Sequence, residues 1–376
     1  MSSPAHPGLS RSALLSASDR LTTIASHIRA SGPKPKVVVL RNLGPDVMPL
    51  LLERSDIEVI VWPEDRACDR QWLLDNVSGA SGIIATLSDK INPEALDAAG
   101  PSLKVVSTMS VGYEHIDVEA VAQRNIQVGY TPDVLTEAVA DISVMLALMA
   151  GRNARQGVEV VTRGEWPPWA PFAFCGPQLS TNTITRTRTA GFIGFGRISQ
   201  ATLARLIPFS FTHCVYTSSP SSQPNPVADT QTAQKYNLRS VRRVSLDEVA
   251  EQSDVVFVLA PGGPSTYHIV NEAFLRKMKK TSVLVNTSRG TLVDSNALAR
   301  ALHEGWIWGA GLDVVEGEPN VRSDHPLVKE QRCVIVPHIG SATNETRVAM
   351  ATLAAQNLLA GLFNEPMPVP LQLNRT

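Results

Sequence analysis

The chain has 376 residues, of which 43% are hydrophobic and 18% charged, and its 34 Lys and Arg side chains nearly balance 35 Asp and Glu. That length and composition fit a globular protein of two domains, and the near-zero net charge gives no field that would attract nucleic acid or an anionic membrane. No apolar run approaches the roughly 20 residues that span a bilayer. Four scattered cysteines without a Cys-x-x-Cys pair argue against a disulfide framework and a metal site, and favour a reducing compartment such as the cytoplasm.

Residues 1–34 differ in composition from the rest of the chain. They are rich in Ser and Ala and carry Arg11, Arg20 and Arg29 against a single acid, Asp19. A flexible tail has this composition, and so does a mitochondrial presequence, which is rich in Arg and Ser and poor in acid. The sequence leaves both interpretations open.

Two series of short apolar runs predict two parallel sheets. The first series is KVVVL (36–40), IEVIVW (57–62), GIIA (82–85) and LKVVSTM (103–109), with helical stretches between the runs. This alternation predicts a βαβ architecture, with helices on both faces of a parallel sheet. The second series comprises AGFIGFG, HCVYTSS, DVVFVLA, SVLVNTS, GAGLDVV and CVIVPH. We therefore expect two doubly wound α/β domains.

Several segments connect or follow these two series. Residues 136–153 predict a long buried helix that bridges the domains, with Thr136 as its N-cap. Residues 344–363 predict another helix, which either closes the second domain or returns to the first. The stretches 178–189 and 218–234 lack a packing pattern, and we expect both to be exposed loops.

The sequence GFIGFGRISQ (191–200) leads from a predicted strand into a predicted helix through closely spaced glycines. Gly194 suits a tight turn, and Gly196 would let a pyrophosphate approach the backbone at the helix N-terminus. Ser199 replaces the usual third glycine, at a position that needs only a small side chain, and its hydroxyl can return to a carbonyl of its own helix. The stretch predicts a dinucleotide-binding loop, with a purely structural strand–helix turn as the alternative.

The next predicted strand ends without the acidic residue that commonly holds the adenine ribose of NAD. In place of an acid it has a group of serines: Ser218, Ser219, Ser221 and Ser222. Hydroxyls can donate to a 2′-phosphate, and no carboxylate would repel it. The run favours NADP(H) and leaves NAD(H) open, because it contains no arginine.

Five longer motifs carry a resemblance to a known family: STMSVGYEHID, VGYTPDVLTE, VNTSRG, GLDVVEGEP and VPHIGSAT. Over residues 36–373 the chain resembles the D-2-hydroxyacid dehydrogenases, and most of all the branch that reduces glyoxylate and hydroxypyruvate to glycolate and D-glycerate. The resemblance implies a flavodoxin-like substrate domain (35–150 and 339–376) with a Rossmann-like cofactor domain (151–338) inserted into it. The active site would then lie in the cleft between the two domains.

The family's catalytic Arg, Glu and His correspond to Arg289, Glu318 and His338. The planar fork of an arginine can hold the carboxylate of a 2-keto acid and polarise its ketone. When hydride reaches the carbonyl carbon, the oxygen needs a proton, which His338 can donate near neutral pH. Glu318 would orient the imidazole and favour its charged form.

The resemblance also implies binding roles for other residues. Backbone amides of Val111 and Gly112 would hold the substrate carboxylate, with Gly340 and Ser341 beside His338. The segment EWPPWAPF implies a homodimer in which Trp169 reaches the partner's substrate pocket. The residues implied to contact the cofactor are Gly194, Gly196, Arg197, Ile198, Thr287 and Asp313.

The chain departs from the family pattern at several places. Ser219 stands where NADP-using relatives carry an arginine, and Pro261 where they have a serine near the cofactor. The stretches 178–189 and 220–235 are longer than the family's connections. A phosphoglycerate or D-lactate type of dehydrogenase, and a non-enzymatic NAD(H)-sensing corepressor of the same fold, remain as alternatives. The complete Arg–Glu–His set argues against the corepressor.

Overall fold

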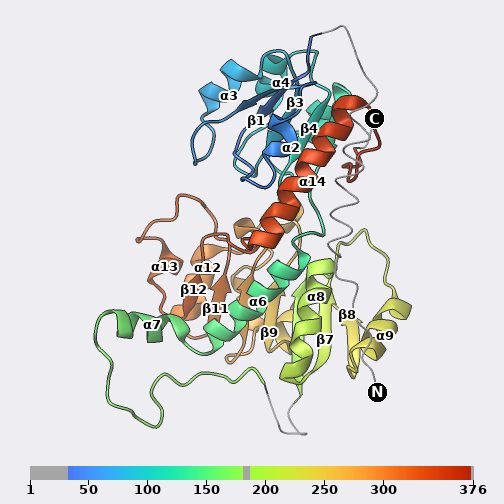
Figure 1. Cartoon of the computed structure of the whole chain (residues 1–376). Helices are drawn as coiled ribbons and strands as arrows, with labels where there is room; N and C mark the ends of the chain where they lie inside the picture. Colours follow the sequence, from blue (N-terminus) through green and yellow to red (C-terminus); the bar gives the residue numbers. More distant parts are fainter. Residues whose placement is uncertain (1–32, 181–186, 374–376) are drawn as a thin grey trace, which may run out of the picture.

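The computed structural model describes residues 33–180 and 187–373, so the segment predicted as a tail or presequence lies almost wholly outside the described residues. Two lobes, each built on its own sheet, are joined near the middle of the molecule (Figure 1). Within the described ranges, no helix is both long and apolar enough to cross a membrane.

The first lobe contains a five-stranded sheet in the order β2-β1-β3-β4-β5, and all of its strands are parallel. Its central strands are short and buried on both faces, chiefly by Val, Ile and Ala with the buried Ser107 and Thr108, as expected for a parallel sheet covered on both sides. The strands are β1 (Lys36–Val39), β2 (Glu58–Val61), β3 (Ala80–Ala85), β4 (Val105–Thr108) and β5 (Gln127–Gly129).

Helices cover both faces of this sheet. One face packs against α3, α4 and α5, and the other against α2 and the long C-terminal helix α14. Helix α14 contacts β3, β4 and β5, so the C-terminal helix returns to the first sheet (Figure 1). The helices of this lobe are α2 (Pro49–Leu52), α3 (Arg70–Val77), α4 (Pro93–Ala99), α5 (Val118–Gln123) and α14 (Asn344–Phe363).

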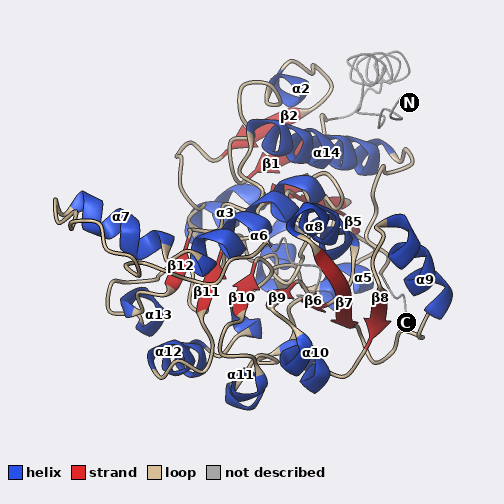
Figure 2. Ribbon diagram, turned by 90° about the horizontal axis from the view of Figure 1, so that it is seen from below, coloured by secondary structure: helices blue, strands red, loops and turns tan. Residues whose placement is uncertain are grey.

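The second lobe contains a seven-stranded parallel sheet in the order β12-β11-β10-β9-β6-β7-β8 (Figure 2). The chain crosses from β8 back to β9 beside β6, so the strand order reverses around β6, which leads into the glycine loop. The strands are β6 (Arg188–Ile193), β7 (Phe211–Thr217), β8 (Ser240–Arg243), β9 (Val255–Val258), β10 (Val283–Asn286), β11 (Gly309–Leu312) and β12 (Cys333–Ile335).

Two apolar clusters lie on opposite sides of the seven-stranded sheet. Helices α10, α11 and α12 cover one face, and α6 and α8 cover the other. The helices of this lobe are α6 (Thr136–Gly151), α7 (Ala154–Thr162), α8 (Arg197–Leu206), α9 (Pro226–Lys235), α10 (Leu246–Gln252), α11 (Glu272–Lys277), α12 (Ser295–His303) and α13 (Pro326–Lys329), with single 3-10 turns at Ile207–Phe209, Pro264–Thr266 and Gly290–Leu292.

The two parallel sheets confirm the predicted fold class, but two strands were missed. Strands β5 (QVG) and β8 (SVRR) lack a β-branched run, and they form by pairing with β4 and β7 respectively. Such edge strands depend on a neighbour that local sequence does not reveal.

Helix α6 starts where expected but is capped differently. Thr136 is the first helical residue, not the N-cap, and the N-cap Leu135 has no side-chain hydrogen bond to offer. The helix packs on α8, β10 and β11. Its contacts thus associate it with the second sheet, and we propose a domain boundary before Thr136 in place of one after residue 150.

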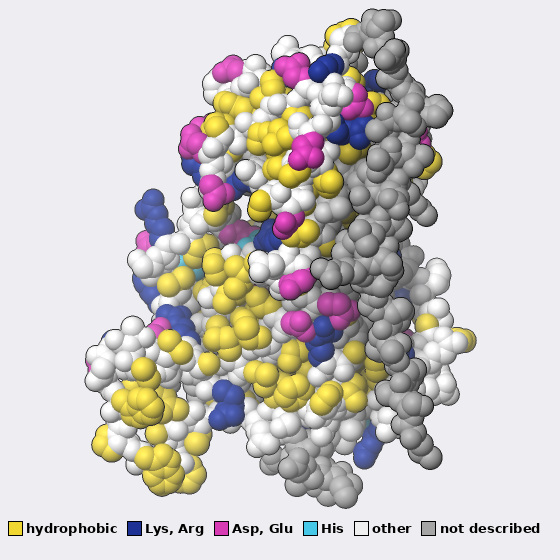
Figure 3. Space-filling model, viewed as in Figure 1, with side chains coloured by type: hydrophobic (Ala, Val, Ile, Leu, Met, Phe, Trp, Pro, Cys, Tyr) yellow, Lys and Arg dark blue, Asp and Glu magenta, His cyan; other side chains and the backbone are white. Residues whose placement is uncertain are grey.

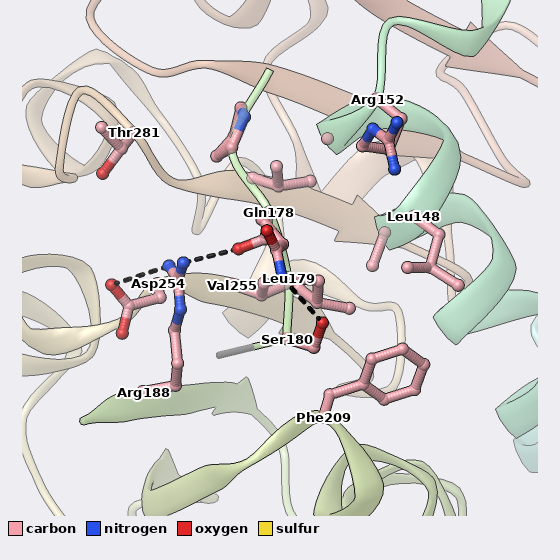
Figure 4. A pocket seen from close by; sticks show the side chains of 14 residues that line it. Leu148, Arg152, Gln178, Leu179, Ser180, Arg188, Phe209, Asp254, Val255 and Thr281 are labelled. Atoms are coloured by element: carbon pink, nitrogen blue, oxygen red, sulfur yellow. Dashed lines mark hydrogen bonds and ion pairs between the residues drawn. The ribbon is translucent and has the colours of Figure 1, made fainter. Parts of the chain in front are cut away.

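Parts of the two stretches that were expected to be exposed loops belong to a helix and a strand. Residues 226–235 form α9, because the side chain of Asn225 accepts from the amide of Ala228 and Pro226 suits the first helical turn. In the other stretch, residues 181–186 lie outside the described part of the chain, but Arg188 starts β6 and its side chain is only 15% exposed. It lines a small pocket of about 80 Å³, where Nη2 donates to the carbonyl of Gln178 at 2.5 Å (Figure 4).

Candidate active site

A cavity of about 1540 Å³ lies between the lobes and receives residues from both. The first lobe contributes Glu114 and His115, which follow β4. The second contributes side chains that follow the carboxyl ends of β10, β11 and β12, which are Arg289, Asp313, Glu318 and His338. Ligands of open parallel α/β sheets bind at this edge, where loops from several strands converge.

His338 and Glu318 form a hydrogen-bonded pair in the cavity. Nδ1 of His338 lies 3.0 Å from Oε1 of Glu318, and both side chains are about one-third exposed. A carboxylate on Nδ1 orients the imidazole and leaves Nε2 as the nitrogen that can exchange a proton with a ligand. The structure therefore brings together two of the three predicted catalytic residues.

The turn that carries His338 is held by a buried carboxylate. His338 has a positive φ of 53°, and the next two amides, of Ile339 and Gly340, donate to Asp313 at 2.7 and 2.9 Å. Asp313 is 2% exposed; burial raises its pKa, and the two backbone donors oppose that rise. A Cβ at Gly340 would lie 2.7 Å from Oδ2 of Asp313, so this contact requires glycine.

Arg289 approaches the cavity from the end of β10 and pairs with the other lobe. Its Nε lies 3.2 Å from Oε1 of Glu114, and its Nη2 lies 3.3 Å from Oε2. A Cβ at Gly112 would lie 1.7 Å from Nη2 of Arg289, so the guanidinium is directly against the Gly112 backbone. The predicted substrate arginine thus faces the predicted carboxylate-binding segment.

The segment after β4 offers free backbone donors. Among the described residues, the amides of Val111 and Gly112 have no hydrogen-bond acceptor. The carbonyl of Gly112 is held by the hydroxyl of Ser110 at 2.6 Å, so the amides are presented by a fixed turn. Two unpaired amides beside a guanidinium are suited to bind a carboxylate.

His115 lies behind this turn and was missed in the sequence as a cavity residue. Its Nε2 is 2.9 Å from the hydroxyl of Thr108, which also contacts Ser110. Burial is the main cause that lowers the pKa of His115 to about 4; Glu114 opposes this shift and Arg289 adds to it. The imidazole is therefore neutral near pH 7 and belongs to a hydrogen-bonded support for the 110–112 turn.

The glycine loop has the geometry of a dinucleotide site. Gly194 has φ +87°, and a Cβ there would lie 2.8 Å from the backbone of Ala260, whereas a Cβ at Gly196 would meet open space. Gly196 is the N-cap of α8 without a side-chain capping bond, so the helix start is open to an anion. The hydroxyl of Ser199 donates to the carbonyl of Gly194 at 2.7 Å. It therefore returns to the turn and not, as expected, to a carbonyl of its own helix. These features fit a pyrophosphate.

The other predicted cofactor residues lie around this loop and the cleft. Arg197 forms an ion pair with Asp133, and Ile198 packs against the residues that start α6. The hydroxyl of Thr287 lies 2.8 Å from that of Ser143. Pro261 is exposed, in the connection after β9.

The serine-rich loop after β7 has a neighbour that the sequence did not reveal. The hydroxyls of Ser218 and Ser222 are 3.0 Å apart, and those of Ser219 and Ser221 are 2.7 Å apart. Arg243, from the end of β8, donates to two carbonyls of this loop. It was missed because β8 itself was not predicted.

Trp169 does not reach the cavity of its own chain. It is 87% exposed, on the segment that follows α7 and extends away from the body of the molecule (Figure 1). Ser341 follows the His338 turn but is not among the residues that line the cavity. No group of three or more His, Cys, Asp or Glu side chains suited to a metal ion occurs in the described ranges.

A dinucleotide-type loop beside a cleft that holds an arginine and a His–Glu pair defines an α/β dehydrogenase. The chain belongs to the D-isomer specific 2-hydroxyacid dehydrogenase family, whose NAD-binding domain profile matches residues 144–340.

Similar proteins cover nearly the whole chain. The chain is 42% identical to the human glyoxylate reductase/hydroxypyruvate reductase, over 90% of this chain and 98% of the relative. It is 41% identical to the glyoxylate reductase of Thermofilum pendens, over 89% and 94%. A crystal structure of NADPH-dependent glyoxylate/hydroxypyruvate reductase from Sinorhizobium meliloti, in complex with NADP and malonate, superposes with a TM-score of 0.72 at 32% identity, over 91% and 98%.

Proposed function

We propose that this protein reduces glyoxylate and hydroxypyruvate to glycolate and D-glycerate with a nicotinamide cofactor. The observation that carries the proposal is the placement of Arg289, opposite the free amides of Val111 and Gly112, in the same cavity as the His338–Glu318 pair. The names of the similar proteins give the substrate class.

In the proposed reaction, Arg289 and the amides of Val111 and Gly112 bind the carboxylate of the keto acid. The guanidinium also polarises the ketone, since its fork presents donors in two directions. The bound cofactor supplies a hydride to the carbonyl carbon. His338 then gives the proton on Nε2 to the carbonyl oxygen, while Glu318 stabilises the imidazolium and holds its orientation. Gly340 holds the His338 turn through the hydrogen bond of its amide to Asp313, and Ser341 follows on the same turn.

The cofactor site is proposed to run from the glycine loop to the serine-rich loop. Gly194, Gly196, Arg197 and Ile198 would surround the pyrophosphate, with Thr287 and Asp313 near the nicotinamide. Ser218 and its neighbours, and Pro261, would border the adenosine. Hydroxyl groups in place of an acid support use of NADPH, as does the NADP-bound Sinorhizobium meliloti relative.

We also propose that the protein is a homodimer. Trp166, Trp169 and Phe172 are each at least 79% exposed on one extended segment, where hydrophobic side chains gather at the outer end of α7 (Figure 3). Large exposed hydrophobic side chains that gather in one region mark protein interfaces. In the dimer, Trp169 would enter the substrate pocket of the second copy.

Initial rates test the proposed activity. NADPH and NADH oxidation would be compared with glyoxylate, hydroxypyruvate, pyruvate and 3-phosphohydroxypyruvate. We expect the highest kcat/KM with glyoxylate or hydroxypyruvate. Faster turnover of pyruvate or the phosphorylated acid would assign the protein to another branch of the family, and folded protein without turnover would overturn the proposal.

A further inference from the structure

We propose that Arg243 binds the 2′-phosphate of NADPH and supplies the positive charge that the loop after β7 lacks at position 219. This inference rests on the proposed use of a nicotinamide cofactor, and it assigns cofactor choice to a residue on a different strand.

The sheet places Arg243 beside the serine-rich loop. Strands β7 and β8 are parallel neighbours, and Tyr216 pairs with Arg243 in their register. Because the strands run in the same direction, the end of β8 and the loop after β7 meet at one edge of the sheet. That edge also holds the glycine turn, since the amide of Gly194 donates to the carbonyl of Thr217 at 2.9 Å.

The guanidinium of Arg243 spans the loop. Nη1 donates to the carbonyl of Ser222 at 2.6 Å, and Nη2 donates to the carbonyl of Ser219 at 3.0 Å. These bonds use two of the five N–H donors of the side chain. They fix a half-buried guanidinium against the four serines and leave donors for a ligand.

Arg243 forms no ion pair within the described part of the chain, and the carboxylate of Asp229 in α9 accepts instead from the hydroxyl of Tyr216. Many other arginines of this chain, by contrast, pair with a carboxylate. The stretch from Thr217 to Pro226 contains no Asp or Glu. A fixed guanidinium beside four hydroxyls, at the edge where an adenine ribose would lie, is suited to a phosphate dianion.

The preceding residue provides a matched control. Arg242 lies one position earlier on β8, so its side chain leaves the opposite face of the strand, and its Nη2 donates to Oε1 of Gln252 at 2.9 Å. Arg242→Ala removes the same charge from the same strand without touching the serine-rich loop.

The test measures binding of adenosine 2′,5′-bisphosphate and of 5′-AMP by calorimetry, and of NADPH and NADH by fluorescence, without a keto acid. For Arg243→Ala we expect Kd for the bisphosphate and for NADPH to rise roughly ten- to a hundredfold, as for loss of a charge-assisted contact. The Kd values for 5′-AMP and NADH should change by less than about twofold, since neither ligand carries the 2′-phosphate that Arg243 would contact in this exposed loop. Arg243→Lys should recover part of the loss, and Arg242→Ala should match the wild type.

Two results would overturn the inference. Equal weakening of the bisphosphate and 5′-AMP by Arg243→Ala would mean that Arg243 only shapes the loop. Equal loss in Arg242→Ala would mean that any charge on β8 suffices. Because these measurements contain no keto acid, failure of the proposed reductase activity would appear separately, as absent turnover with nucleotide discrimination intact.

Discussion

Arg289 of the second lobe and Glu114 of the first lobe form an ion pair across the cleft, with Nε and Oε1 separated by 3.2 Å. The two side chains are 30% and 45% exposed, so the pair contributes little to the free energy of unfolding. Its importance is positional. The carboxylate of Glu114 occupies donors of Arg289 that the proposed reaction assigns to the carboxylate of the substrate.

Glu114 therefore competes with the substrate for Arg289. We expect Glu114→Gln to lower KM for the keto acid by up to about fivefold, since a half-exposed pair is worth at most ~1 kcal/mol. The value of kcat should stay nearly constant, because the competition affects binding and not the proton transfer. Steady-state kinetics of Glu114→Gln measure this, with Glu119→Gln as the control, an exposed acid of α5 outside the cavity. A raised KM would show that Glu114 orients Arg289 for substrate.

Replacement of Arg289 should damage both binding and turnover. Arg289→Ala removes a charge-assisted pair of hydrogen bonds, and we expect kcat/KM to fall roughly a hundredfold or more. Arg289→Lys should recover only part of this, because an ammonium cannot reproduce the planar fork. If the lysine variant equals the wild type in kcat/KM, the bidentate contact is not used.

His338→Ala should lower kcat by about 10²–10⁴-fold, the usual contribution of a positioned general acid. Cofactor affinity should be unchanged, because the side chain acts on the substrate oxygen. Glu318→Gln should give a smaller loss, since a neutral amide can still contact Nδ1 but cannot stabilise the imidazolium. Single-turnover kinetics with separately measured cofactor Kd would distinguish these effects. A kcat within about threefold of wild type in His338→Ala would point to a different proton donor.

His115 should make the stability of the protein depend on acid pH. Its pKa lies at about 4 in the folded chain, below the usual 6.5, so the unfolded chain takes up a proton that the folded chain does not between these values. The contribution of His115 is therefore complete above pH 6.5 and is lost as the pH falls toward 4. The lowering of the pKa from 6.5 to about 4 corresponds to at most about 3 kcal/mol in the free energy of unfolding, and contact of the ring with solvent reduces this figure.

Denaturant unfolding of His115→Gln between pH 4 and 7 measures this contribution. The variant should show a smaller fall in the free energy of unfolding across that range than the wild type. His303→Gln is the control, because His303 is 80% exposed and lies on the outer surface of α12. Equal slopes in His115→Gln and the wild type would contradict the assigned burial of His115.

The sequence predicts those parts of the fold and site that are encoded locally. The glycine loop, the residues after β10, β11 and β12, and most strands are contiguous motifs with their own patterns. Features that need a spatial neighbour were missed. Strand β8 is stabilised by pairing with β7, and the position of Arg243 depends on that pairing. The contact of Glu114 with Arg289 joins residues 175 positions apart, which no local pattern indicates.

Ser218→Asp should turn the cofactor preference toward NADH. A carboxylate after β7 can accept from the ribose hydroxyls of NADH, and it would repel the 2′-phosphate of NADPH. In the wild type, the hydroxyl of Ser218 lies 3.0 Å from that of Ser222. The carboxylate of the aspartate variant would therefore stand within the loop that Arg243 spans. The new carboxylate would also draw Arg243 into an ion pair, so that its charge is no longer free for the 2′-phosphate.

Ser218→Asn, which is similar in size and uncharged, is the matched control. We expect the ratio of kcat/KM for NADPH to that for NADH to fall roughly ten- to a hundredfold in the aspartate variant, with little change in the asparagine variant. An equal fall of this ratio in both variants would mean that the substitutions have distorted the loop. A wild-type protein that already prefers NADH would contradict the role assigned to these hydroxyls, but it would leave the reductase proposal intact.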